Sequence, residues 1–174
     1  MKIKAFILLS LLLISCGKGK IADKVDQSQF EGTTTLKIAL VKLEDAGKSG
    51  EKIGCDDSIV YIEKTADGTK LEDNRKVQLA LKELFAYGAT DTSAEYYNGL
   101  GQATNVKVEQ VNVSNNGKNE NITVNLSGEL TSGGTCDDPR IQNQIISTIK
   151  ANSNATEIIV MINDKNLDEY FNMK

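Results

Sequence analysis

Residues 135–162 read TCDDPRIQNQIISTIKANSNATEIIVMI and predict an amphipathic helix followed directly by a strand. The helix is indicated by isoleucines at four-residue spacing, which share one helix face: Ile141, Ile145 and Ile149. Its start is marked by Pro139 at the first helical position, with Asp137 or Asp138 as the N-cap. Residues 157–162 are apolar on both faces, which predicts a central strand of a sheet. The stretch therefore indicates a fold that combines helices and strands.

The segment before this helix predicts a β-hairpin. Residues 106–113 and 122–126 carry apolar side chains at alternate positions, which is the period of a strand. The alternation breaks at residues 109–110, and this break indicates a β-bulge. The Asn-Gly pair at 116–117 tolerates the positive φ of a tight turn between the two arms.

The N-terminal half of the domain also predicts strands followed by a helix. Residues 36–41 and 58–63 alternate in the way strands do. A helix is expected from Asp73, its predicted N-cap, to Gly88, which can end it in the left-handed conformation. Its apolar stripe consists of Val77, Ala80, Leu81, Leu84 and Phe85. The order β-β-α-β-β-α-β predicts an α+β fold in which two helices cover one face of a mostly antiparallel sheet.

The N-terminus, MKIKAFILLSLLLISC over residues 1–16, has the pattern of an export signal. Two lysines precede an apolar segment that is too short for a membrane span, which takes about 20 residues. The closing Leu-Ile-Ser-Cys resembles the lipobox of bacterial lipoprotein precursors, which implies that Cys16 is lipidated and becomes the first residue of the mature chain. An ordinary signal peptide with an incidental cysteine and an N-terminal membrane anchor are the alternatives.

These features divide the chain into four parts. Residues 1–15 are the predicted lipoprotein signal peptide, and residues 16–33 comprise the lipidated Cys16 and a polar, flexible tether. Residues 34–163 are the predicted domain, and residues 164–174 are a predicted polar C-terminal tail. The expected location is the extracytoplasmic side of a cell membrane, to which the lipid holds the protein.

The composition excludes several classes of function. The 174 residues include no histidine, so a Ser-His-Asp triad, a Cys-His pair and a zinc site with histidine ligands are ruled out. The formal net charge is -4 and the chain has no run of lysine or arginine, so a nucleic-acid partner is not expected. No cofactor, resident metal or catalytic residue is predicted.

A Cys-Asp-Asp motif occurs twice, at residues 55–57 and 136–138. With Cys16 lipidated, Cys55 and Cys136 are the two remaining thiols of an exported protein, so a disulfide is predicted between them. Closing a loop of about 80 residues would stabilise the fold by roughly 4 to 5 kcal/mol in the chain-entropy model. The alternatives are a redox-active dithiol and a metal site. That site would use the carboxylates, alone for calcium or together with the thiolates, of Asp56, Asp57, Asp137 and Asp138.

Residues 36–162 resemble the GerMN domain of bacterial sporulation and spore-germination lipoproteins. The resemblance is carried by the order and spacing of short segments at residues 54–60, 79–84, 97–100, 124–128, 134–141 and 158–163, with Gln144 on the second helix. It implies a small α/β domain similar to the ring-building motifs of secretion and sporulation assemblies. It also implies action by protein contact at the cell envelope, and it supplies no catalytic residue.

The leading hypothesis is therefore a non-catalytic, membrane-anchored lipoprotein with a role in envelope, sporulation or germination assembly. Its partner would be an unidentified envelope protein or a second copy of the chain, met at a sheet edge or at the hairpin. The candidate contact residues are Asp56, Asp57, Asp137, Asp138 and Arg140.

Two other hypotheses remain open at this point. A ligand-binding lipoprotein would hold calcium at the paired aspartates or a cell-wall glycan on the rings of Tyr87, Tyr96 and Tyr97. An enzyme would use carboxylate pairs as acid and base, such as Glu83 with Glu95 or Asp137 with Asp138.

Overall fold

The computed structural model describes residues 32–68, 70–88, 95–102, 105–115, 117 and 119–172. The predicted signal peptide, Cys16 and the predicted tether up to residue 31 lie outside the described residues.

The described strands form two sheets. The first has the order β1-β3-β2 and contains β1 (Thr33–Lys42), β2 (Glu51–Lys52) and β3 (Ser58–Asp67). The second has the order β4-β5-β6-β7 and contains β4 (Lys107–Asn115), β5 (Glu120–Ser127), β6 (Glu157–Ile162) and β7 (Lys165–Asn166). The α-helices are α1 (Asp73–Ala86), α2 (Asp137–Ala151) and α3 (Leu167–Asn172), and the 3-10 turns are η2 (Gly54–Asp56) and η3 (Gly99–Gln102).

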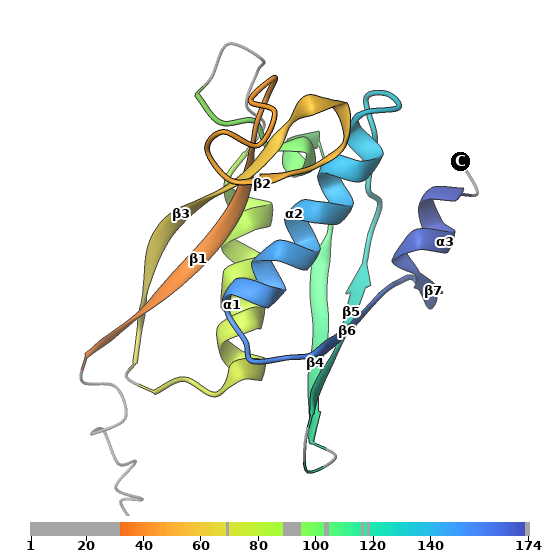
Figure 1. Cartoon of the computed structure of the whole chain (residues 1–174). Helices are drawn as coiled ribbons and strands as arrows, with labels where there is room; N and C mark the ends of the chain where they lie inside the picture. Colours follow the sequence, from red (N-terminus) through yellow and green to blue (C-terminus); the bar gives the residue numbers. More distant parts are fainter. Residues whose placement is uncertain are drawn as a thin grey trace, which may run out of the picture.

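Helices α1 and α2 lie between the two sheets (Figure 1). Both helices contact β1, while α1 also contacts β4 and α2 also contacts β6. The α+β class and the order of the main elements are as predicted. The expectation of one sheet with helices on a single face was wrong, because β1 pairs with β3 along one edge and with α2 along the other. No strand of the hairpin can therefore join that edge of the first sheet.

Strand pairing is mostly antiparallel, as predicted. β1 and β3 pair in one register from Thr33 opposite Asp67 to Lys42 opposite Ser58. The hairpin of β4 and β5 has its predicted bulge, since the register shifts between Val108 and Gln110. The parallel pair is β5 with β6.

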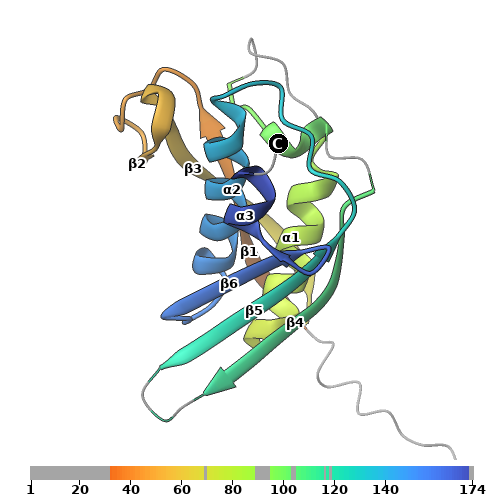
Figure 2. The same ribbon diagram turned by 90° about the vertical axis from the view of Figure 1, so that its right-hand side faces the viewer.

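Strand β6 occupies the predicted internal position, but one of its faces is not covered. Ile159 on that face is 37% exposed, and Figure 2 shows no helix in front of β4 and β5 on this side of the sheet. The prediction of a central strand is therefore confirmed, although the apolar Ile159 on one of its faces is exposed.

The main core lies between the sheets and combines the apolar faces of all three helices. Val77, Leu81 and Leu84 of α1 are fully buried against the isoleucine stripe of α2. Leu167 and Phe171 of α3 join the same core. The segment predicted as a polar tail therefore contains a helix whose apolar side chains pack against the domain.

The starts of the helices differ from the prediction. Asp73 and Asp137 are the first helical residues, and the preceding residues make no side-chain cap. Pro139 is consequently the third residue of α2, where its missing N–H is harmless because first-turn N–H groups have no intrahelical partner. Both aspartates bind other segments instead. Asp73 accepts the backbone N–H of Asn154, and Asp137 accepts that of Gly133.

Candidate functional site

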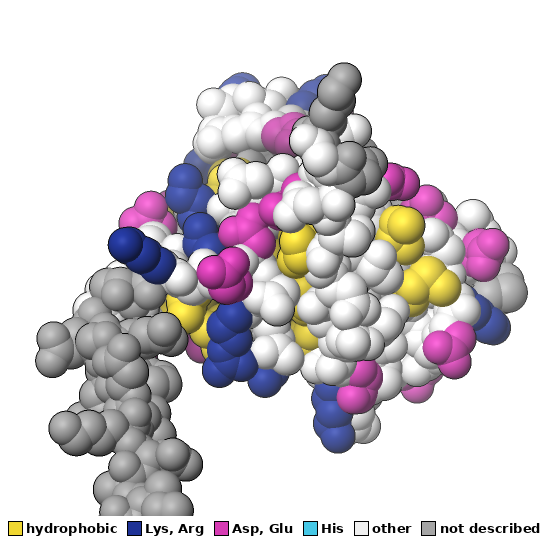
Figure 3. Space-filling model, turned by 90° about the horizontal axis from the view of Figure 1, so that it is seen from below, with side chains coloured by type: hydrophobic (Ala, Val, Ile, Leu, Met, Phe, Trp, Pro, Cys, Tyr) yellow, Lys and Arg dark blue, Asp and Glu magenta, His cyan; other side chains and the backbone are white. Residues whose placement is uncertain are grey.

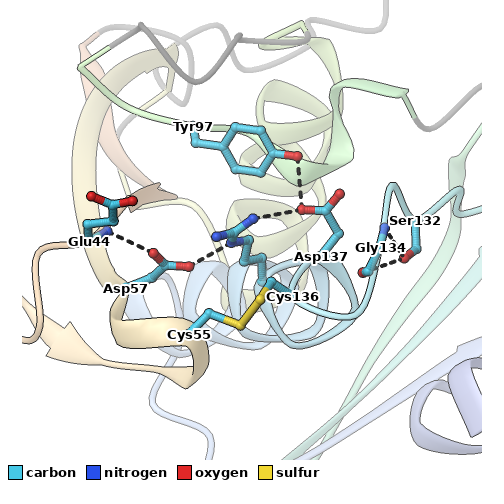
Figure 4. The surroundings of a disulfide bond; sticks show 9 residues. Glu44, Cys55, Asp57, Tyr97, Ser132, Gly134, Cys136 and Asp137 are labelled. Carbon is cyan, nitrogen blue, oxygen red and sulfur yellow. Dashed lines mark hydrogen bonds and ion pairs between the residues drawn. A yellow bond between two sulfur atoms is a disulfide. The ribbon is translucent and has the colours of Figure 1, made fainter.

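A disulfide joins the two Cys-Asp-Asp motifs. Cys55 lies in η2 with a left-handed φ of 61°, and Cys136 immediately precedes α2. Their Cα atoms are 5.9 Å apart although 81 positions separate them in the chain. The bond therefore holds the start of α2 against the turn that leads into β3 (Figure 4).

Asp45 fixes the loop that carries Cys55. Its carboxylate accepts the Ser58 hydroxyl at 2.7 Å, the Ser49 backbone N–H at 2.6 Å and the Ser49 hydroxyl at 2.8 Å. The hydrogen bond from Ser58, followed by those from Ser49, lowers the pKa of Asp45 to about 2. Asp45 thus stays charged at neutral pH and orders the approach to the disulfide.

Beside the disulfide, Arg140 lies between two aspartates. Its Nε donates to Asp57 Oδ2 at 2.6 Å, and its Nη1 donates to Asp137 Oδ1 at 3.0 Å. Asp57 is fully buried, and its other oxygen accepts the backbone N–H of Glu44 at 2.9 Å. A buried carboxylate needs such partners, because an unpaired one costs several kcal/mol.

Tyr97 completes this ionic cluster. Its hydroxyl donates to Asp137 Oδ1 at 3.0 Å, and the Arg140 guanidinium lies 5.2 Å from its ring centre. Burial, followed by the hydrogen bond to Asp137, raises the pKa of Tyr97. Burial alone would lower the pKa of Arg140, but the hydrogen bonds and charges of Asp57 and Asp137 outweigh it and raise that pKa. Arg140 therefore stays positively charged between its two aspartate partners.

The structure brings only some of the predicted residues together. Asp57, Asp137 and Arg140 form the cluster, whereas Asp56 is exposed and pairs with Lys52 at 2.7 Å. That pairing lowers the pKa of Asp56. Asp138 lies outside the cluster, and its Oδ1 is buried without a hydrogen-bond partner among the described residues.

The cluster does not suit a metal ion. Arg140 already supplies the positive charge between Asp57 and Asp137, and the disulfide removes the two thiolates as ligands. Within the part of the chain that the structure describes, no three Cys, Asp or Glu side chains are arranged to hold a metal. The geometry therefore gives the calcium and thiolate alternatives no support at this position.

The candidate glycan and acid-base residues have other places in the fold. Tyr87 and Tyr96 pack against the main core, while Tyr97 packs with the separate cluster of Ala39, Val41 and Ile59. The three rings thus belong to two different packing clusters. Asp137 is held by Arg140, Tyr97 and Gly133, so its carboxylate is committed to structure.

Helix α2 also seals the outer edge of β1, which the sequence analysis missed. Thr148 Oγ1 accepts the N–H of Ala39 at 3.0 Å, and Gln144 Nε2 donates to the Ala39 carbonyl at 3.1 Å. Asn152 accepts the N–H of Lys37 at 3.0 Å and donates to its carbonyl at 2.6 Å. These three side chains lie at four-residue spacing beside the isoleucine stripe, and that spacing was the available signal.

The sealed edge continues beyond α2. Val41 exchanges two backbone hydrogen bonds with Tyr97, at 2.9 and 2.7 Å. Gln144 also accepts the N–H of Gly99 and donates to Asn98 Oδ1, both at 3.0 Å. The outward N–H and C=O groups of β1 are thus hydrogen-bonded at Lys37 and Ala39 by side chains. At Val41 they are hydrogen-bonded by the backbone of Tyr97.

In the described part of the chain, no strand covers the outer edge of β4 or most of the outer edge of β3. β2 pairs only with Ser58 and Ile59 of β3, so no described strand covers this edge of β3 beyond those two residues. β4 is the terminal strand of the second sheet, and no described residue hydrogen-bonds to the outer side of its backbone. An edge strand presents unpaired N–H and C=O groups at every second residue.

Comparison with known proteins gives one family and two solved structures. The family model Germane, described as sporulation and spore germination, matches residues 56–168. The chain is similar to the tandem GerMN domains of the sporulation protein GerM from Bacillus subtilis, at 15% identity and a TM-score of 0.44, over 76% of this chain and 40% of that one. It is also similar to a candidate lipoprotein from Clostridium perfringens, at 16% identity and a TM-score of 0.40, over 77% of each chain. No curated protein matches.

Within the described residues, none of the helices has the length and apolar character needed to cross a membrane.

Proposed function

The chain belongs to the Germane family of sporulation and spore germination proteins, and from this premise we propose that it is an exported, lipid-anchored module that binds other proteins and carries out no chemistry. The lipid is attached to Cys16 after residues 1–15 are removed. Residues 16–33 form the tether that holds the domain on the extracytoplasmic side of the cell membrane. The partner is an envelope protein of an assembly in which the family acts.

The open outer edge of β4 is the observation that carries this proposal. Open edges are usually blocked in natural proteins because they pair with other chains. Here one edge of the first sheet is sealed by Gln144, Thr148 and Asn152, while the terminal strand of the second sheet is left unpaired among the described residues. An edge that is left open beside a sealed one is suited to strand addition by a partner.

The surface and the ionic cluster support the same interpretation. Figure 3 shows one face of the molecule, on which apolar side chains appear as small separate areas among charged ones. A large apolar patch, the usual mark of an obligate interface, is not seen on that face. The charged groups beside the disulfide are bonded to one another, so each already has a partner within the fold, which supports a structural role.

The anchoring is tested by metabolic labelling with a fatty acid in a bacterium that processes lipoproteins. The wild-type chain is expected to carry the label and to fractionate with membranes, and Cys16→Ser is expected to lose both properties. A labelled Cys16→Ser chain would contradict anchoring at this residue.

The interaction is tested by photo-crosslinking in intact cells, with the photoreactive residue placed at Gln110 of β4. A discrete crosslinked product is expected from the anchored chain, and a matched position on the sealed side, Lys150 of α2, is expected to give none. Absence of any product at Gln110, together with a monomeric chain at high concentration, would contradict the proposal.

A further inference from the structure

A groove follows the seam between α1 and β4. Three cavities lie along it, with volumes of 440, 200 and 380 Å³. The first lies where α1 ends and β4 begins, and the last lies where α1 begins and β4 ends. Adjacent cavities share Glu109 and Asn74, so they follow one another along β4 and are together called the groove. The third cavity lies on one face of the sheet and reaches Glu120 of β5.

The groove opens onto the unpaired edge of β4. Its first two cavities are lined by the consecutive residues 106–111. Consecutive residues of a strand point to opposite faces, so a cavity lined by several residues in succession, as each of these two is, lies at the edge of the strand. An extended chain in this groove would therefore meet the unpaired N–H and C=O groups of β4 on one side and α1 on the other.

The end of the groove near the C-terminus of α1 has a net positive charge, since two lysines outnumber Glu109, whose carboxylate accepts the Ser127 hydroxyl. Lys82 and Lys107 are both exposed there, and neither forms an ion pair among the described residues. Phe85 and Val108 provide the apolar floor between them. Such a lining can bind a peptide whose apolar side chain contacts Phe85 and Val108 and whose adjacent carboxylate accepts hydrogen bonds from the lysines.

The opposite end of the groove is acidic. Glu72, Asp73 and Glu120 line it, and the Glu120 Oε1 atom is buried without a hydrogen-bond partner among the described residues. Burial, followed by the hydrogen bond and charge of Asp73, raises the pKa of Glu120. A positive group placed here would relieve the repulsion between the two carboxylates.

The charges give the groove a direction. β4 runs from the basic end to the acidic end, so an antiparallel chain would enter at the acidic end and finish at the basic end. Such a chain places its amino-terminal side near Asp73 and Glu120 and its carboxyl-terminal side near Lys82 and Lys107. A parallel chain would reverse both pairings, because its amino-terminal side would face the lysines.

On these grounds, and resting on the proposed function, we propose that the groove binds an extended segment of a partner protein as an additional strand antiparallel to β4. The segment carries a positive group at its amino-terminal side and an apolar residue followed by a carboxylate at its carboxyl-terminal side. The bulge at Glu109 limits regular pairing to Gln110–Asn115, so the last residue of the segment lies beyond the bulge, between the lysines.

The test uses the full chain in detergent and a synthetic eight-residue peptide as the probe. The peptide begins with lysine, alternates threonine with valine and ends in leucine with a free carboxylate. We expect binding with slower amide hydrogen exchange in β4 and unchanged exchange at the open edge of β3. Reversing both lysine charges with Lys82→Glu and Lys107→Glu is expected to weaken binding about tenfold, and amidation of the peptide carboxylate is expected to weaken it as well.

The matched control reverses two exposed lysines elsewhere, with Lys48→Glu and Lys150→Glu, and is expected to leave the affinity unchanged. Melting curves of both double variants establish that they are folded. The proposal is overturned if the peptide does not bind at about 1 mM, if it protects β3 instead of β4, or if the two double variants weaken binding equally. A partner crosslinked at Gln110 in cells together with any of these results would leave the proposed function standing and reject only the proposed segment chemistry and its direction.

Discussion

The outer edges of β1 and β4 both lie next to a helix, but the backbone of β1 is hydrogen-bonded by side chains there and the backbone of β4 is not, among the described residues. Beside β1, Gln144 and Thr148 of α2 and the C-cap residue Asn152 bind the backbone at Lys37 and Ala39. Beside β4, helix α1 leaves a groove, and the edge keeps its unpaired groups among the described residues. The difference lies in the side chains that each helix turns toward the strand.

The comparison shows how an edge is closed without another strand. A carboxamide both donates and accepts, so one Asn or Gln can satisfy an N–H and a C=O of the same strand residue. These hydrogen bonds require α2 to hold a constant position relative to β1. The disulfide and the bond from Arg140 to Asp57 attach the start of α2 to the first sheet. Helix α1 has no comparable attachment to β4 among the described residues, which is consistent with a seam that receives a partner.

The largest effect is expected from removing the disulfide that holds α2 beside the first sheet. Cys55→Ser combined with Cys136→Ser should lower the free energy of unfolding by about 4 kcal/mol, because the unfolded chain loses a constraint over a long loop. Urea unfolding measures this change. Reduced wild-type protein is the control and should match the variant, whereas an unchanged unfolding midpoint would show that the bond does not stabilise the sealed side.

A loss of similar size is expected from Arg140→Met. This variant leaves Asp57 buried with its main partner removed, which should cost about 3 to 5 kcal/mol. The triple variant Arg140→Met, Asp57→Asn and Asp137→Asn should recover much of the loss, since no buried charge is then uncompensated. If the triple variant were no more stable than the single one in urea, the ionic cluster would not be the reason for the loss.

A moderate effect is expected from Asn152→Ala, which reopens the edge of β1 at Lys37. The unpaired N–H and C=O should lower the free energy of unfolding by about 1 to 3 kcal/mol. Gln78→Ala on α1 is the matched control, because among the described residues Gln78 bonds only to the exposed Arg75, and it should change stability by less than about 0.5 kcal/mol. Equal losses of unfolding free energy in the two variants, measured in urea, would contradict the view that Asn152 stabilises the fold by sealing the edge of β1.

The smallest effect is expected from Glu120→Gln at the acidic end of the groove. Because the pKa of Glu120 is raised in the folded chain above its ordinary value of 4.5, the folded state binds the proton more tightly than the unfolded state. The ionised carboxyl therefore destabilises the fold increasingly as the pH rises above about 4.5. The Gln variant should melt at a slightly higher temperature at pH 7, and the difference should vanish below about pH 4.

Thermal melting over a pH series measures this effect, with Glu157→Gln on the exposed face of β6 as the control. A Glu120→Gln chain that melts below the wild type at pH 7 would contradict the description of the acidic end as a site of unrelieved repulsion.

The sequence predicted the elements of the fold well, because their signals are local. The isoleucine spacing located α2, alternation located β6, and the break at residues 109–110 located the bulge. The count of cysteines predicted the disulfide that the structure contains. The division into two sheets was missed, because strand alternation does not indicate which strands pair.

The site was predicted only in part, because its contacts join distant segments. The aspartates beside the cysteines and Arg140 were named, but the bond from Arg140 to Asp57 spans 83 positions. The sealing of β1 by Asn152 spans 115 positions. Polar residues at four-residue spacing beside the isoleucine stripe were the available signal, and identifying their partners required the tertiary structure.

Amide hydrogen exchange of the full chain without any partner tests the contrast between the two edges most directly. We expect slow exchange for the amides of Lys37 and Ala39, whose hydrogens are bound by Asn152 and Thr148. We expect fast exchange at every second amide of Gln110–Asn115, on the side of β4 that faces the groove. Uniform protection along β4, or fast exchange at Lys37 and Ala39, would contradict this contrast.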